Sequence, residues 1–163
     1  MTLLRLYGAS CEEGRPLPQR LSKSDGKTRN VKHKSLLDSF ALMAWIQNEK
    51  GAQIVEDLLL AARRTGTKLL VHEINLAEVY DLTIRRAGEE RARTIAAQLL
   101  DLPLQVVATT TDILWQAARL KAHYPLSLAD AFAAATALAL DARVVTGDPE
   151  FKAIASLIEI LWL

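Results

Sequence analysis

The segment KSLLDSFALMAW, residues 34–45, joins a short apolar run to a helical stretch through one acidic side chain, Asp38. Residues 34–38 are predicted to form a short buried strand, and residues 39–48 are predicted to form the helix that follows it. Asp38 stands where the chain of an α/β protein leaves a strand and enters a helix. A short strand that is apolar on both faces is typical of a parallel sheet with helices on both sides.

The same alternation of strand and helix continues along the rest of the chain. We predict strands over 68–72, 104–108, 143–146 and 157–162, and helices over 51–64, 75–86, 89–101, 111–123 and 127–140, with a short helix after Asp148. This order predicts a parallel sheet wound by right-handed crossovers, with helices on both faces. In such sheets, ligands bind outside the carboxyl ends of the strands.

Length and composition favour a single globular domain. The chain has 163 residues, half of them hydrophobic, which is enough for one domain with its own core. Cys11 is the single cysteine, so no internal disulfide can form and a reducing compartment is expected. No apolar run approaches the roughly 18 residues that a membrane helix needs. We therefore expect a cytoplasmic protein that does not enter a membrane.

The charge is unevenly distributed along the chain. Residues 1–34 carry eight Lys or Arg and three Asp or Glu, whereas residues 35–163 carry twelve and sixteen. Residues 1–30 also show no hydrophobic period, so they are predicted to be a basic, disordered extension before a domain at 31–163. Such an extension could contact nucleic-acid phosphates. Alternatively, it is a plain leader, or sequence upstream of the true start.

Four acidic side chains recur at predicted strand-to-helix junctions: Asp38, Glu78 in INLAEVY, Asp130 in LSLADAF and Asp148 in VVTGDPEF. Each has a purely structural explanation. Asp38 and Asp148 could be helix N-caps, the latter followed by proline at the first helical position. Asn75-x-x-Glu78 and Ser127-x-x-Asp130 have the form of capping boxes. Taken one at a time, the four positions fit capping as well as function.

Taken together, the four acids indicate a cation site. Glu78 and Asp130 lie in otherwise apolar helical stretches, and burying an unpaired carboxylate is costly unless a cation is shared. Thr146 and Ser39 place hydroxyl groups beside two of the acids. A set of oxygen ligands favours Mg²⁺ or Mn²⁺. His33, His72 and His123 are scattered, and no cluster of His or Cys suggests zinc.

The motifs LLDSFALMAW, INLAEVYD, LSLADAFAAATAL and VVTGDPEF, in this order, resemble the PIN domain family and most of all the VapC-type toxin ribonucleases. The resemblance implies an α/β/α sandwich with a central parallel sheet. It assigns the catalytic and metal-binding acids to Asp38, Glu78, Asp130 and Asp148, with Thr146 in the last motif. It also implies Mg²⁺- or Mn²⁺-dependent hydrolysis of RNA that leaves a 5′-phosphate, a small antitoxin as partner, and a homodimer in many members.

Other interpretations stay open on the sequence alone. A nuclease of the same fold could act in RNA maturation or on DNA, and a non-catalytic PIN-like module would share the pattern. A receiver-like module would need a lysine at the end of the last strand, and LIEILWL has none. Two basic groups are either substrate contacts or solvated helix faces: Arg85, Arg86, Arg91 and Arg93, and Arg119, Lys121 and His123. A partner could dock on the helix at 51–64 or on the helix at 75–86.

Overall fold

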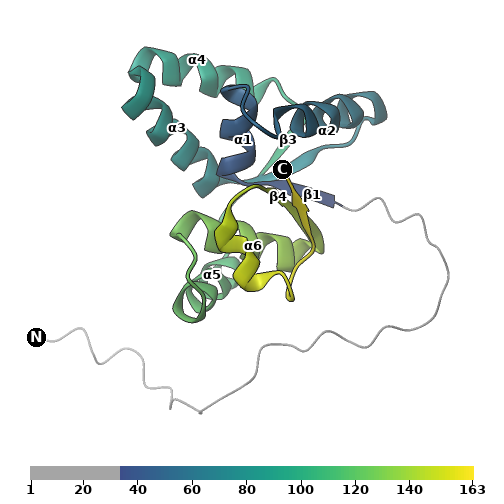
Figure 1. Cartoon of the computed structure of the whole chain (residues 1–163), viewed down its shortest axis with the longest axis vertical. Coiled ribbons are helices and arrows are strands. Elements are labelled where there is room, and N and C mark those ends of the chain that lie inside the picture. The colour runs from purple at the N-terminus through teal and green to yellow at the C-terminus, as the bar shows by residue number, and fades with distance from the viewer. Residues whose placement is uncertain (1–33) are drawn as a thin grey trace, which may run out of the picture. The chain divides into compact units, whose positions relative to one another are not determined.

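The computed structural model describes residues 34–163, which form a parallel five-stranded sheet covered by helices (Figure 1). The strands are β1 (Lys34–Leu37), β2 (Leu69–His72), β3 (Leu104–Val107), β4 (Ala142–Thr146) and β5 (Ile160–Trp162). The helices are α1 (Ser39–Ile46), α2 (Ala52–Thr65), α3 (Glu73–Ala87), α4 (Glu89–Leu100), α5 (Thr111–His123), α6 (Leu128–Leu140) and the 3-10 helix η2 (Pro149–Ile154). The extension predicted for residues 1–30 lies outside the described residues, as do residues 31–33.

The strand order is β3-β2-β1-β4-β5, and every neighbouring pair is parallel. The chain builds outward from β1 to β3 on one side and then crosses to β4 and β5 on the other. The carboxyl ends of β1 and β4 therefore lie side by side, with Leu37 in register with Val145. This is the point at which strand order reverses, where parallel sheets form their ligand sites.

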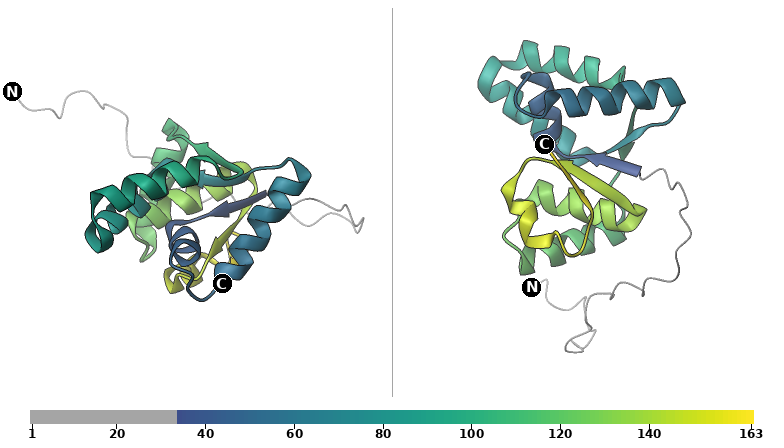
Figure 2. Two further views of the ribbon diagram at one scale, coloured as in Figure 1. Left: turned by 90° about the horizontal axis from the view of Figure 1, so that it is seen from above. Right: turned by 45° about the vertical axis from the view of Figure 1, so that its right-hand side comes forward.

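Alternating residues of the central strands fill two separate cores. Leu36 and Val144 pack with α5, α6 and η2, whereas Leu37 and Val145 pack with α1, α2, α3 and α4. Successive side chains of a strand point to opposite faces, so each face of the sheet receives its own apolar set. Figures 1 and 2 show α1–α4 on one side of the sheet and α5 and α6 on the other. The predicted three-layer α/β/α sandwich is confirmed.

Most predicted boundaries agree with the structure within a few residues, and the exceptions have physical causes. Gly66, at φ +66°, ends α2 as predicted, and Gly88, at φ +83°, ends α3. The edge strand β3 is covered less completely than the central strands. Val106 is 47% exposed there because β3 is an edge strand. None of the helices in residues 34–163 is long and apolar enough to cross a membrane.

Candidate active site at the switch point of the sheet

Asp38 follows β1 and is fully buried at the start of α1. The backbone N–H of Ala41 donates a hydrogen bond of 2.8 Å to Asp38 Oδ1, which confirms the predicted N-cap. The other oxygen, Oδ2, has no well-formed hydrogen bond among the described residues. Burial raises the pKa of Asp38 to about 7, against the lowering effect of the Thr146 hydroxyl and of Ala41. The capping interaction therefore uses one carboxylate oxygen and leaves the second without a partner.

Asp130 lies in the first turn of α6 and is also buried. Its backbone N–H donates to Ser127 Oγ at 3.0 Å, so the predicted cap at Ser127 is confirmed. The reciprocal bond of a capping box comes from elsewhere, because Ser127 N donates to Glu150 Oε2 at 2.7 Å. Burial, helped by the charges of Asp148, Glu78 and Glu150, raises the pKa of Asp130 to about 6, against the lowering effect of the Ser127 hydroxyl.

Asp148 follows β4 and caps η2, as predicted. Its Oδ1 accepts a hydrogen bond from Glu150 N at 2.8 Å, and Pro149 occupies the first turn. Its own backbone N–H donates to Thr146 Oγ1 at 2.9 Å. Thr146 is fully buried, and its hydroxyl lies close enough to the Asp38 carboxyl to lower the pKa of that group. The last motif thus connects the ends of β1 and β4 through one hydroxyl group.

The predicted capping box at Asn75-x-x-Glu78 is wrong. Helix α3 begins at Glu73 and is capped by His72, so Glu78 lies in the second turn. Asn75 is fully buried, and its Nδ2 donates to Ala129 O at 3.3 Å and to Ser39 Oγ at 3.5 Å. The Ser39 hydroxyl in turn donates to the Glu78 carboxylate. Asn75 and Ser39 therefore connect α3 to α1 and α6 and hold Glu78 in place.

These elements enclose a cleft of about 240 Å³ that we call the acidic cleft. It is lined by Ser39, Phe40, Met43, Glu49, Glu78, Leu82, Arg86, Ser127, Asp130, Asp148 and Glu150. Asp38 is buried beside it, within electrostatic reach of Asp130 and Asp148, whose charges raise its pKa. The four acids predicted from sequence thus come to one region, although they derive from four separate segments.

The chemistry of this region fits a hard cation. Asp38 Oδ2 is a buried acceptor without a partner, and neighbouring carboxylates raise the pKa of both Asp38 and Asp130. Carboxylate oxygens are the ligands that Mg²⁺ and Mn²⁺ take, and a cation would relieve this repulsion. Among residues 34–163, no three acidic, His or Cys side chains are already grouped as a metal cage. Side-chain rearrangement would therefore accompany binding.

Several residues of the cleft are not evident from the sequence. Glu150 contacts Ser127, which is distant along the chain, so no local pattern marks Glu150. The sequence marks Asn75 only as part of a capping box, and its contact to Ala129 is not evident there. Glu49 and Phe40 line the cleft beside the expected acids. Conversely, the basic group Arg119, Lys121 and His123 does not line it. Lys121 Nζ instead donates to Leu126 O at 2.8 Å.

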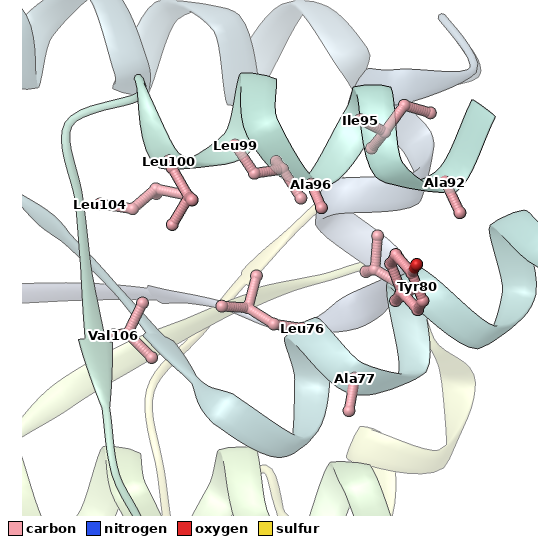
Figure 3. A pocket seen from close by; sticks show the side chains of 11 residues that line it. Leu76, Ala77, Tyr80, Ala92, Ile95, Ala96, Leu99, Leu100, Leu104 and Val106 are labelled. Carbon is pink, nitrogen blue, oxygen red and sulfur yellow. The ribbon is translucent and has the colours of Figure 1, made fainter. Parts of the chain in front are cut away.

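A second hollow, the apolar pocket, lies on the α1–α4 side of the sheet (Figure 3). It has a volume of about 280 Å³ and is formed by α3, α4 and β3. Figure 3 shows Leu76 and Tyr80 of α3 facing Leu99 and Leu100 of α4, with Leu104 and Val106 at one side. Leu100 is 77% exposed, so the pocket is open to a partner.

The parallel sheet with an acidic cleft at its switch point defines the class of protein. The sequence pattern of the PIN domain matches residues 35–157, and the chain belongs to the PIN domain family. A comparison with curated proteins gives no match.

Solved structures of low sequence identity share the fold. VapBC2 from Rickettsia felis, bound to a promoter DNA fragment, is 16% identical with a TM-score of 0.62, covering 78% of this chain and 96% of that one. VapC20 from Mycobacterium tuberculosis, described as a toxin that cleaves the sarcin–ricin loop, is 19% identical with a TM-score of 0.61 over 74% and 95%. A toxin–antitoxin complex from Klebsiella pneumoniae is 20% identical with a TM-score of 0.57 over 78% and 96%.

The raised pKa of Asp38 predicts a pH-dependent stability of the metal-free protein. Because this pKa is about 7 in the folded state and 3.8 ordinarily, the folded state binds more protons than the unfolded state between these values. The free energy of unfolding in EDTA should therefore fall as pH rises from about 4 to about 7, by up to roughly 4 kcal/mol at about 1.4 kcal/mol per pKa unit. Urea unfolding across this range measures the decline.

Asp38→Asn should lessen that decline, since an asparagine can still cap α1 but does not titrate. The exposed Asp112 provides a matched control, and Asp112→Asn should retain the wild-type pH profile. An Asp38→Asn profile that coincides with the wild-type profile would show that the Asp38 carboxyl titrates normally.

Proposed function

We propose that this chain is a metal-dependent endoribonuclease and the toxin of a toxin–antitoxin pair. The observation that carries the proposal is the convergence of Glu78, Asp130 and Asp148 on one cleft beside the buried carboxyl of Asp38. Membership of the PIN domain family supports it. The likeness in fold to VapC20, a toxin described as cleaving the sarcin–ricin loop, favours RNA as the substrate.

Six residues in or beside the acidic cleft have a role in the proposed reaction. Mg²⁺ or Mn²⁺ held by Asp38, Glu78, Asp130 and Asp148 would neutralise charge on the scissile phosphate and acidify a water. The Thr146 hydroxyl lies beside the Asp38 carboxyl, whose pKa it lowers, and accepts a hydrogen bond from the backbone N–H of Asp148. Ser39 orients Glu78. The burial of Asp38 also shields its carboxyl from bulk water.

Two other functions make different predictions about the same cleft. A nuclease that acts on DNA or in RNA maturation would use the same acids, but on a different nucleic acid. A non-catalytic interaction module would need only the cap of α1 that Asp38 Oδ1 supplies and not its second buried oxygen, whose burial in charged form is costly. The raised pKa of Asp38 and Asp130 therefore favours an enzyme over a module.

Cleavage of RNA tests the proposal directly. The purified full chain should cut a mixed RNA pool with Mn²⁺ or Mg²⁺ and should not cut it in EDTA. Asp38→Asn and Asp130→Asn should each lower the rate at least about 100-fold, since even indirect partners of metal ligands commonly change activity 10–100-fold. Gel analysis with end-labelled RNA measures both the rate and the chemistry of the new ends.

The control for this experiment is Asp112→Asn, an exposed acid of α5 outside the acidic cleft, which should keep the wild-type rate. Single-stranded DNA of matching sequence serves as a second substrate. Faster cleavage of DNA than RNA would assign the chain to a DNA nuclease, and equal rates for wild type and both cleft variants would refute a catalytic role for the acids.

The proposed partner is a small antitoxin with an apolar helical segment that enters the apolar pocket. Its lining is almost entirely hydrophobic side chains from α3, α4 and β3, so it suits the apolar face of a helix. Solved structures of similar fold include complexes of toxin with antitoxin, which supports such a partner. Of the two helices predicted as docking faces, the helix that contributes to the pocket is α3. Whether the chain forms a homodimer stays a prediction.

Two exposed leucines distinguish docking at the apolar pocket from docking on α2. Leu100 borders the apolar pocket and is 77% exposed, whereas Leu60 lies on α2 and is 51% exposed. Leu100→Asp should weaken binding of the proposed antitoxin at least about 10-fold, or about 1.4 kcal/mol, because it places a charge in an apolar interface. Leu60→Asp should bind as wild type. Calorimetry measures both affinities, and the reverse ranking would move the docking site to α2.

A further inference from the structure

The four arginines around Gly88 differ in their partners. Arg85 forms an ion pair of 2.8 Å with Asp81, and Arg93 forms one of 2.7 Å with Glu89, both on exposed helix surface. Within residues 34–163, Arg86 and Arg91 form no ion pair with an acidic side chain. The charges of Arg85 and Arg93 are therefore compensated locally, and those of Arg86 and Arg91 are available to a ligand.

Arg86 occupies a distinctive place on α3. Its Nη1 donates to Gln47 Oε1 at 2.8 Å, and Gln47 caps the C-terminus of α1. This bond restrains the guanidinium without neutralising it, because the amide of Gln47 carries no charge. Arg86 is also the one Lys or Arg side chain that lines the acidic cleft among the described residues.

Arg86 borders a further hollow that we call the arginine hollow. It has a volume of about 130 Å³ and is lined by Met43, Ile46, Gln47, Thr83, Arg86, Ala87, Arg91 and Ile95. The acidic cleft and the arginine hollow share Met43 and Arg86 in their lining, so the two are neighbours. A strand bound at the acids could therefore continue past Arg86 to Arg91.

Electrostatics explain why a nuclease with this site needs such a continuation. The acidic cleft is lined by five carboxylates and would repel a polyanion, and a cation offsets only the charge nearest to it. Binding the rest of a nucleic-acid strand requires positive groups next to the acids but outside them. A guanidinium with a planar set of donors matches phosphate oxygens, and Gln47 has already oriented that of Arg86.

We propose that Arg86 and Arg91 form a phosphate-binding track through the arginine hollow, which holds the backbone of the RNA strand next to the bond that is cut. The proposal rests on the proposed ribonuclease function and adds the direction in which the substrate leaves the acidic cleft. Phosphate contacts set affinity and register but not base preference. The track should therefore act equally on RNAs of different sequence.

Binding of a fluorescein-labelled single-stranded oligo(U) RNA tests the track. The full chain carrying Asp38→Asn is used so that the RNA stays intact, and anisotropy is followed over a range of salt concentrations. Adding Arg86→Gln or Arg91→Gln should weaken binding at low salt about 5-fold or more, and should lower the slope of log affinity against log salt by about 0.7 for each phosphate that the variant no longer binds. Arg85→Gln and Arg93→Gln are the matched controls and should change affinity less than about two-fold.

The outcomes separate the track from general charge effects. Equal reductions in affinity for Arg85→Gln and Arg86→Gln, or no reduction for Arg86→Gln and Arg91→Gln, would overturn the track, and so would undetectable binding of the RNA at the lowest salt. All four arginines are exposed, so the variants should keep the wild-type melting temperature and remain comparable.

The same experiment distinguishes the track from the nuclease proposal. Selectively weaker binding by Arg86→Gln and Arg91→Gln in a chain whose wild type cuts no RNA would support the track and refute the nuclease. Cleavage of RNA by wild type, without selectively weaker binding by Arg86→Gln and Arg91→Gln, would support the nuclease and refute the track. An oligo(T) DNA of equal length identifies the strand: tighter RNA binding supports RNA, and tighter DNA binding overturns the assignment to RNA.

Discussion

The burial of the Asp38 carboxyl at the end of the central strand is the constraint on which the site depends. Strand β1 lies between β2 and β4, so its carboxyl end is covered by elements from both sides of the sheet. Burial raises the pKa of Asp38 to about 7 and leaves Oδ2 without a well-formed hydrogen bond. The folded chain can satisfy this oxygen with a proton or with a cation. The fold therefore produces a buried carboxylate oxygen to which a metal ion could bind.

Hydrogen bonds around Asp38 hold the other acids near it. Thr146 lies beside Asp38 at the switch point and accepts a hydrogen bond from the backbone N–H of Asp148, and Ser39 and Asn75 connect Glu78 to α1 and α6. Capping and catalysis are not alternatives in this arrangement. The cap of α1 uses Oδ1 of Asp38 and orients the carboxyl, while Oδ2 is left for chemistry. Helix starts thus position Asp38, Asp130 and Asp148, whereas Glu78 is held from the second turn of α3.

Local patterns explain what the sequence predicts well. Three features depend on neighbours in sequence. They are the alternation of strands and helices, the helix caps at Asp38 and Asp148, and the helix ends at Gly66 and Gly88. Tertiary contacts decide the rest. The place of Glu78 within α3 follows from bonds between Asn75 and residues of two other helices, and the exposure of β3 follows from strand order. No window of sequence contains either piece of information.

Proton release on metal binding tests the central claim most directly. Near pH 6.5 the Asp38 carboxyl, with a pKa of about 7, is mostly protonated, so a cation that binds there must displace its proton. Titration calorimetry with Mn²⁺ in two buffers of different ionisation enthalpy should give a release of about one proton per cation, falling towards zero about two pH units higher. Asp38→Asn should remove most of the release, since the lower pKa of Asp130, about 6, leaves that carboxyl mainly ionised at this pH. Tight Mn²⁺ binding without proton release at the lower pH would contradict the account.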